Sequence, residues 1–476
     1  MEPMTGIDAK FLYSETSTAH MHTLKVAVVA TGDAPGWFGF DQVMSVLGQQ
    51  MSTLPPLRRR PVPVPFGLGH PVWIEDPDFD LANHVSWRTA PAPGDDRQLA
   101  AIVADIAGAP LRRDRPLWEL VVVDGLSDNR GAVVAKLHHA VADGGAAVAL
   151  LQSVARGVER QLAAHHGPGG PGPEPAPPDP WRPEPVPDRR RLLLLSARQH
   201  RDRLRDLPRL IRRSYRGMRA SESRRRSLPV RPPLPLQAPR TSLNVSLTKE
   251  RCFAMTRLPL DDLRAVRRAH GTTLNDVYLA VCAGALRSYL IDGGELPRRP
   301  LVASVPVSTD PDGTRMAGNR VDNLYVSIGT DIADPIERLL HIHRVAASAK
   351  EVRRELGPDL LEQRAAIVPP QLYRASVRAW TRTHLANRVR PPLNVVLSNV
   401  AGPHDPIAFG PVALQAIYSV GPILEGIGCN MTAWSYGDGL YVSVLGCPAS
   451  LPDPWQLADR LHGALAELVA GSGSPG

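Results

Sequence analysis

A stretch of proline and glycine near the middle of the chain most constrains what it can fold into. The sequence HHGPGGPGPEPAPPDPWRPEPVPD occupies residues 165–188. Proline lacks the amide hydrogen that helices and sheet ladders need, so this stretch cannot sustain either structure. A chain of 476 residues is also too long for one ordinary core. The sequence therefore predicts two globular parts, residues 1–157 and 240–476, joined by a linker over residues 158–239.

Both predicted parts mix strands with helices. Short β-branched runs predict buried strands, and Ala- and Leu-rich runs with apolar residues at helical spacing predict helices. Before the linker, strands are expected at 23–30, 117–126 and 131–139, and a helix from 144. After it, a helix is expected over 260–290 and strands at 301–308, 323–330 and 393–400. The sequence thus predicts an α/β fold.

The linker carries the positive charge of the chain. Residues 189–226 contain fifteen arginines against three acidic residues, a local charge of +12, while the rest of the chain sums to −4. The apolar residues Leu204, Leu207, Ile211, Tyr215 and Met218 share one face of a predicted helix, which Pro208 is expected to kink or restart. Such a helix suits an anionic membrane surface. A solvated charge run is the plain alternative, and nucleic acid is disfavoured because Tyr215 is the one aromatic residue among these arginines and no nucleic-acid module is recognisable.

The sequence AKLHHAVADGGAAVAL, residues 135–150, places His138 and His139 at the end of a predicted strand. Adjacent residues of a strand point to opposite faces, and no HExxH or neighbouring cysteine completes a metal site, so no metal is predicted. One histidine can instead enter a cleft as a general base, while Asp143 caps the following helix and Gly144 permits a tight turn. A polar turn without catalytic function remains the alternative. A serine nucleophile lacks its usual G-x-S-x-G setting.

The segment HHAVADG, residues 138–144, matches the HHxxxDG motif of CoA-dependent acyltransferases. Several further segments resemble the bacterial wax ester synthase/diacylglycerol acyltransferase family and follow in its order. They are the opening MTGIDAKFLYSET with Met21 and His22, the element Pro116-Leu117-Trp118, the pair Asn275-Asp276, GNRVDNLYVSI at 318–328 and LSNVAGP at 397–403. The resemblance spans nearly the whole chain except residues 158–239.

This resemblance implies a fold like chloramphenicol acetyltransferase and condensation domains, with two α/β halves and a substrate tunnel at their interface. It makes His139 the general base, His138 a supporting residue and Asp143 an orienting residue, with Gly144 giving the backbone room. It also places Asn275 and Asp276 near the tunnel, although capping of their helix explains them equally well. Ser398 and Asn399 are candidate substrate contacts, with a structural turn as the alternative.

The implied reaction transfers a long-chain acyl group from acyl-CoA to the hydroxyl of diacylglycerol, forming triacylglycerol, and also to long-chain alcohols, forming wax esters. Acyl-CoA is a co-substrate and no cofactor is implied. The alternatives are a condensation-like acyltransferase that esterifies another lipid alcohol, and a non-catalytic lipid-binding or lipid-droplet protein. No signal peptide pattern and no apolar run of 18 residues occurs. We therefore expect a cytoplasmic protein that associates peripherally with membranes or lipid droplets through residues 189–226.

Overall fold

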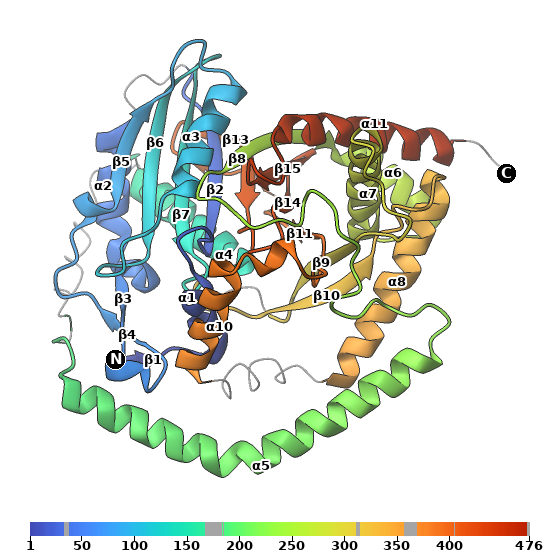
Figure 1. The fold of residues 1–476 in the computed structure, drawn as a ribbon. Helices are drawn as coiled ribbons and strands as arrows, with labels where there is room; N and C mark the ends of the chain where they lie inside the picture. The colour runs from blue at the N-terminus through green and yellow to red at the C-terminus, as the bar shows by residue number, and fades with distance from the viewer. Residues whose placement is uncertain are drawn as a thin grey trace.

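The computed structural model of the protein describes residues 1–32, 38–166, 183, 185–310, 315–356, 369–403 and 405–473. Two six-stranded sheets form the two halves, and a small three-stranded sheet flanks the first (Figure 1). The helices are α1 (Gly6–Ser14), α2 (Phe40–Gln50), α3 (Asp96–Gly108), α4 (Gly144–His166), α5 (Arg189–Ser227), α6 (Leu260–His270), α7 (Leu274–Asp292), α8 (Pro335–Leu356), α10 (Pro370–Arg382) and α11 (Pro454–Ser472).

The first sheet is built mostly from the N-terminal part of the chain. Its strands are, in spatial order, β12 (Ala408–Phe409), β13 (Val412–Val420), β2 (His22–Ala30), β7 (Arg130–His138), β6 (Trp118–Leu126) and β5 (Val85–Thr89). The small sheet consists of β1 (Glu2–Pro3), β4 (Val72–Glu75) and β3 (Arg59–Val62). Strand β13 comes from the C-terminal part and pairs antiparallel with β2, so that Ser419 lies opposite Lys25.

The second sheet belongs wholly to the C-terminal part. Its strands are, in spatial order, β10 (Val321–Ser327), β9 (Val302–Ser308), β11 (Val395–Val400), β14 (Cys429–Tyr436), β15 (Gly439–Gly446) and β8 (Cys252–Pro259). Helix α7 packs against α8 and α11 beside this sheet, and its residues from Val277 to Leu286 are buried. The predicted helix over 260–290 is two helices, because Gly271 ends α6 in a left-handed conformation with φ 63°.

The predicted boundaries of the two parts differ from the structure in two respects. Helix α4 continues to His166, past the expected end of the first part at residue 157. Strand β13 crosses from the second part into the first sheet, where its apolar residues complete the core beside β2. Periodicity within a strand does not reveal which sheet the strand joins, so the sequence pattern does not predict this crossover.

The basic segment of the predicted linker forms one long helix. Helix α5 spans 39 residues and includes Pro208, and Figure 1 shows it bent near its middle along the lower edge of the molecule. Leu192 near its start packs against Val72 and Ile74, and Arg224 near its end pairs with Glu351 of α8. The helix therefore bridges the two halves. Most of the proline-rich stretch, residues 167–182 and 184, lies outside the described residues.

No helix in the described part of the chain is long and apolar enough to cross a membrane.

Candidate active site

The two histidines lie where β7 ends and the turn into α4 begins. His138 is the last residue of β7, one residue before the predicted end of the strand, and Gly144 is the first residue of α4, as the sequence predicted. The backbone N–H of His139 donates to the carbonyl of Met21, at 2.7 Å, so β2 fixes the start of the turn. Gly144 suits this position because a Cβ here would lie 3.1 Å from the side chain of Val400 at the end of β11, closer than ordinary van der Waals contact.

His139 is held by an amide from the other half of the molecule. Its Nδ1 lies 2.9 Å from Oδ1 of Asn319, and its ring stacks on Phe11 with a centroid distance of 4.2 Å. Because an amide oxygen only accepts, Nδ1 carries the proton and Nε2 keeps its lone pair. Nε2 makes no hydrogen bond or ion pair with any residue that the structure describes. His139 therefore presents a free basic nitrogen.

Asn319 has its own orientation fixed. Its Nδ2 donates to Oδ1 of Asp8 and to the backbone carbonyl of His139, both at 2.7 Å. These two acceptors determine which end of the amide faces Nδ1 of His139. The residue lies 180 positions from His139 in the sequence, in the predicted GNRVDNLYVSI segment, but nothing in that segment alone marked it as a partner of the base.

The environment of His139 keeps it neutral. Burial lowers the pKa of His139 to about 4, and the positive charge of Lys25 adds to this shift. The hydrogen bond to Asn319 and the charge of Asp143 act in the opposite direction but are outweighed. At neutral pH the imidazole is thus unprotonated, as a general base requires.

His138 faces a different set of partners. Its Nδ1 accepts the backbone N–H of Ala140 at 3.0 Å, so the proton lies on Nε2, which is 3.1 Å from Oε1 of Glu15. His22 Nε2 lies 3.3 Å from the same oxygen, and Arg113 pairs with the other oxygen of Glu15. Burial alone would raise the pKa of Glu15, but the two histidines and Arg113 hold it well below its usual range. His138 is therefore tied to a buried carboxylate and anchors the turn.

Asp143 connects the turn to the second half and does not contact His139. Its Oδ1 accepts the backbone N–H of Ala146 at 2.9 Å, which is the predicted helix cap. Its Oδ2 accepts from the side chain of Arg315 at 2.7 Å and from the backbone N–H of Arg320 at 2.8 Å. These contacts hold the 315–320 segment, and with it Asn319, against the turn.

The other predicted site residues lie at the start of α7 and on strand β11. Asp276 completes a capping box with Thr273 at the start of α7 and accepts from Nδ1 of His343 at 2.8 Å. Asn275 and Asp276 line neither of the two cavities described below, and capping accounts for the position of Asp276, while their contact with substrate stays a prediction. Ser398 and Asn399 are half-buried on β11, close to Val400 and thus to the turn, and they line neither cavity.

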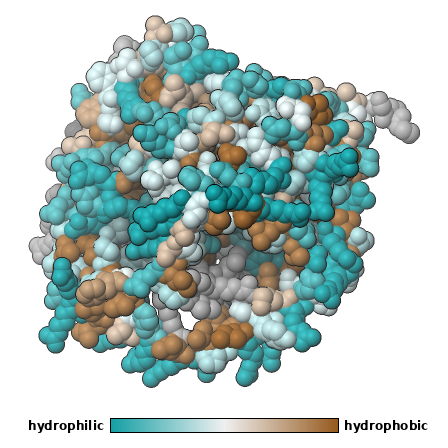
Figure 2. Space-filling view, in the orientation of Figure 1, coloured by the Kyte–Doolittle hydropathy of each residue, from teal (hydrophilic) through white to brown (hydrophobic). Residues whose placement is uncertain are grey.

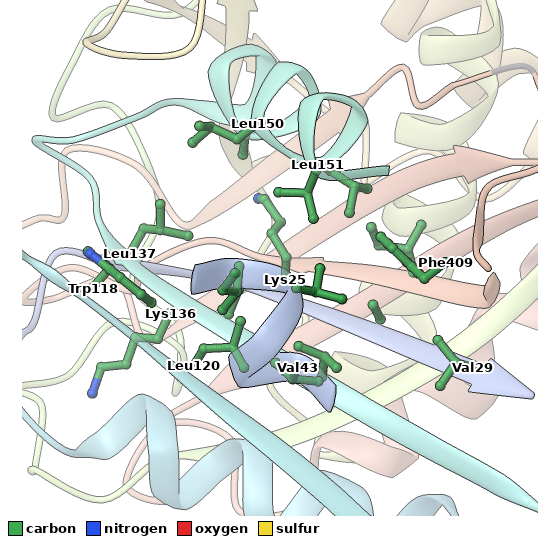
Figure 3. A pocket seen from close by; sticks show the side chains of 18 of the residues that line it. Lys25, Val29, Val43, Trp118, Leu120, Lys136, Leu137, Leu150, Leu151 and Phe409 are labelled. Carbon is green, nitrogen blue, oxygen red and sulfur yellow. The ribbon is translucent and has the colours of Figure 1, made fainter. Parts of the chain in front are cut away.

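Two cavities are lined in part by residues close to His139 in the sequence or by its partner Asn319. The first has a volume of about 1350 Å³, including its opening to solvent, and lies between the first sheet and helices α2 and α4. Its wall is mainly aliphatic and aromatic, and Figure 3 shows Leu120, Leu150, Leu151 and Phe409 around it. Leu137 and Ala147 in this wall flank the turn in sequence. This cavity fits hydrocarbon chains.

The second cavity is polar. It has a volume of about 940 Å³ and is lined by the partners of the turn, Asp8, Arg315 and Asn319, together with Arg59 and Arg320. Residues of the turn or their partners thus line both a hydrophobic space and a polar one, in which three arginines accompany Glu2 and Asp8. That arrangement can bring a charged carrier molecule and a lipid together at one imidazole.

The comparisons with known proteins agree with this geometry. The model of the wax ester synthase/diacylglycerol acyltransferase catalytic domain matches residues 4–278, and that of the WS/DGAT C-terminal domain matches residues 317–469. The chain belongs to this family. Two relatives from Mycobacterium tuberculosis that bear the name "Putative diacyglycerol O-acyltransferase" are 39% and 34% identical over 476 residues. Each alignment covers 99% of this chain and 97% of the relative.

Solved structures of this family and of proteins with a related fold are also similar to this chain. The wax ester synthase/diacylglycerol acyltransferase from Marinobacter aquaeolei VT8 matches with a TM-score of 0.65 and 27% identity, and the match covers 100% of both chains. The first condensation domain of the calcium-dependent antibiotic synthetase matches with a TM-score of 0.58 and 16% identity over 98% of this chain and 96% of that one. The predicted family and the predicted two-half, condensation-domain-like fold are confirmed.

Proposed function

We propose that the protein is an acyl-CoA-dependent O-acyltransferase that esterifies diacylglycerol to triacylglycerol and also accepts long-chain alcohols. Besides family membership, the observation that carries the proposal is the free Nε2 of a neutral His139 next to a hydrophobic cavity. A lipid-binding protein needs the cavity but has no use for a base held in one tautomer.

The reaction follows from the position of the proton on His139. Nε2 accepts the proton of the acceptor hydroxyl while its oxygen attacks the thioester carbonyl of acyl-CoA. The tetrahedral intermediate collapses by breaking the C–S bond, and the imidazolium returns the proton to the leaving thiolate. Asn319 accepts from Nδ1 throughout and keeps the ring oriented. Holding both substrates at once removes much of the entropic cost of their encounter, so no acyl-enzyme is needed.

The cysteines support a mechanism without covalent catalysis. All four are free, and three of them are buried. Burial raises the pKa of Cys252 and of Cys282 to about 12, which suppresses the thiolate that a nucleophile requires. The transfer as proposed also uses no cofactor beyond acyl-CoA itself.

The two cavities suggest how the substrates are arranged. Arg320 is exposed in the polar cavity, where a guanidinium group suits the phosphates of CoA, whereas Arg59 in the same cavity already pairs with Glu2 at 2.8 Å. The hydrophobic cavity suits the hydrocarbon chains of the lipid substrates. In this arrangement the thioester and the hydroxyl meet at His139.

Helix α5 is proposed to dock the enzyme on an anionic membrane or lipid-droplet surface. Leu204, Ile211, Tyr215 and Met218 are all about half exposed or more, and their spacing puts them on one face. Figure 2 shows hydrophobic and hydrophilic side chains alternating along the lower edge of the molecule, where α5 runs. Each arginine near an anionic surface contributes on the order of 1 kcal/mol, so part of the fifteen is sufficient for binding.

The activity is tested by incubating the purified protein with palmitoyl-CoA and either dioleoylglycerol or hexadecanol, and measuring both the ester and the released CoA. We expect ester in the dioleoylglycerol reaction and its loss in His139→Ala. Ester formed only from another lipid alcohol would move the protein to the condensation-like alternative. Lipid binding without any ester would support the non-catalytic alternative.

The membrane proposal is tested by flotation with vesicles that contain or lack anionic lipid. A triple variant, Leu204→Gln, Ile211→Gln and Tyr215→Gln, is expected to lose most binding to anionic vesicles while keeping activity on detergent-dispersed substrate. Trp87→Gln removes a similarly exposed side chain from β5 and serves as the matched control. Equal flotation of all three proteins would contradict the proposal.

A further inference from the structure

A lysine lies in the wall of the hydrophobic cavity. Lys25 is on β2, only 8% exposed, and Figure 3 shows it extending from the strand toward Leu150 and Leu151 of α4. Its Nζ also lies 5.3 Å from the ring centroid of Trp434, another residue of the wall. A buried amino group in a space suited to hydrocarbon is costly unless it has hydrogen-bonding partners, so its presence calls for a function.

Two of the three N–H groups of the Lys25 ammonium donate hydrogen bonds to described residues, and the third has no such acceptor. Nζ donates to Oγ1 of Thr23 at 3.1 Å and to Oγ of Ser419 at 2.5 Å, and an ammonium has three N–H groups. Within the described part of the chain, no carboxylate lies within ion-pair distance and no further acceptor takes the third hydrogen. Burial lowers the pKa of Lys25 to about 7, although the negative charge of Asp143 acts in the opposite direction. The protein therefore holds an incompletely satisfied donor at the cavity.

A second buried lysine of the same wall shows the contrast. Lys136 is fully buried, but its Nζ donates to the carbonyl of Ala109 at 2.6 Å and lies 3.5 Å from Glu119. Figure 3 shows its amino group extending away from Lys25. Lys136 is thus satisfied by the protein, whereas Lys25 is directed toward whatever occupies the cavity.

The substrates of the proposed reaction differ in what they offer such a donor. A long-chain alcohol carries one oxygen, which reacts at His139, and the rest is hydrocarbon. A diacylglycerol carries two ester carbonyls a few bonds from its free hydroxyl. Lys25 is near enough to His139 for its charge to influence that residue. A carbonyl close to the reacting hydroxyl is therefore the group that suits the third N–H.

We propose that Lys25 selects the glycerolipid acceptor by donating a hydrogen bond to an ester carbonyl of diacylglycerol while the free hydroxyl meets His139. The inference rests on the proposed acyltransferase function and names the group that determines its acceptor. An alcohol in the same cavity leaves the donor unpaired against methylene groups, and this penalises the alcohol relative to the glycerolipid. Thr23 and Ser419 act as positioning residues because they fix the direction of the amino group.

The test compares kcat/KM for dioleoylglycerol and for hexadecanol, with palmitoyl-CoA in detergent micelles. Lys25→Met is expected to lower the value for dioleoylglycerol by about 10- to 100-fold, with a much smaller change for hexadecanol. Lys25→Gln keeps an N–H donor and should recover part of the preference. Lys136→Met is the matched control, since it removes a buried lysine of the same wall, and its ratio of the two values should stay that of the parent.

The outcomes separate this inference from the proposed function. A parent protein that forms no ester from either acceptor contradicts the proposed function. An active parent whose acceptor ratio is unchanged in Lys25→Met overturns the inference alone. An equal loss with both acceptors also overturns it, because Lys25 would then serve the acyl donor that the two reactions share. Thermal unfolding of each variant verifies that the compared proteins are folded.

Discussion

His138 and His139 are neighbours in the sequence but belong to two different environments. His138 lies on the side of a buried carboxylate, Glu15, which is also close to His22 and Arg113. His139 lies on the side of an amide, Asn319, and of an aromatic ring, Phe11. The proton is on Nε2 of one ring and on Nδ1 of the other. The partner of each ring, more than its place in the motif, determines whether the imidazole is an anchor or a base.

The amide partner has a chemical consequence. A carboxylate next to Nδ1 would stabilise the imidazolium and raise the pKa of the base, whereas a neutral amide orients the ring without that effect. His139 thus keeps a low pKa while its tautomer is fixed.

Among the changes that test this comparison, removing the base should have the largest effect on turnover. His139→Ala is expected to reduce turnover by about 10²- to 10⁴-fold, because it removes the Nε2 that accepts the hydroxyl proton. His138→Ala should cost less activity, since its ring anchors the turn. Rates of ester formation measure both variants. Small and equal losses at the two positions would show that neither histidine is the base.

Removing the orienting amide should have the next largest effect. Asn319→Leu takes away the acceptor of Nδ1 and the donor to Asp8, and we expect kcat to fall by about 10- to 100-fold. Asn319→Asp should instead raise the pKa of His139 and move the acidic limb of the pH profile to higher pH. Asn323→Ala changes an asparagine of β10 whose side chain, among the described residues, bonds only Ser304, and it should leave kcat unchanged. A similar loss in Asn323→Ala would indicate a general disturbance of the second half.

On the other side of the turn, a change at Glu15 should act on stability more than on chemistry. Glu15→Ala leaves the backbone N–H of Met21 and the side chain of His138 without their acceptor. The loss of a buried acceptor should lower the free energy of unfolding by about 1–3 kcal/mol. Urea denaturation measures the change. Unaltered stability together with abolished turnover would place Glu15 in the chemistry and contradict its role as an anchor.

A change of pH within the near-neutral range should have the smallest effect on activity. With the pKa of His139 lowered to about 4, the base is already neutral at pH 6. The pH profile of kcat/KM for hexadecanol, an acceptor that offers no carbonyl to the ammonium of Lys25, should therefore be nearly flat from pH 7.5 to 6 and fall only below about pH 5. A histidine with the usual pKa near 6.5 would lose about fourfold over the same range. Such a loss at pH 6 would show that the base is solvated and not buried as described.

The sequence predicted the local features of the site. The strand that ends at His138, the helix that begins at Gly144 and the cap by Asp143 all follow from residues close together in the chain. It did not identify Asn319, because that contact depends on how the second half packs against the turn. The sequence left the role of Asp276 open, because helix capping and substrate contact would use the same side chain.

The crossover of β13 and the exposure of Lys25 to the cavity could not be predicted from the sequence either. Lys25 lies in a β-branched run that reads as an ordinary buried strand, and only the pairing with β13 brings Ser419 to its amino group. Family resemblance supplied the reaction and the fold, while the structure supplied the partners of each side chain.

The most direct test of the account is the tautomeric state of the two histidines at pH 7. Protein labelled with ¹⁵N-histidine, with His138→Ala and His139→Ala used to assign the signals, can be examined by long-range ¹H–¹⁵N NMR correlation. The account predicts a neutral His139 with its proton on Nδ1 and a neutral His138 with its proton on Nε2. A protonated Nε2 on His139, or the imidazolium at this pH, would contradict its assignment as the base.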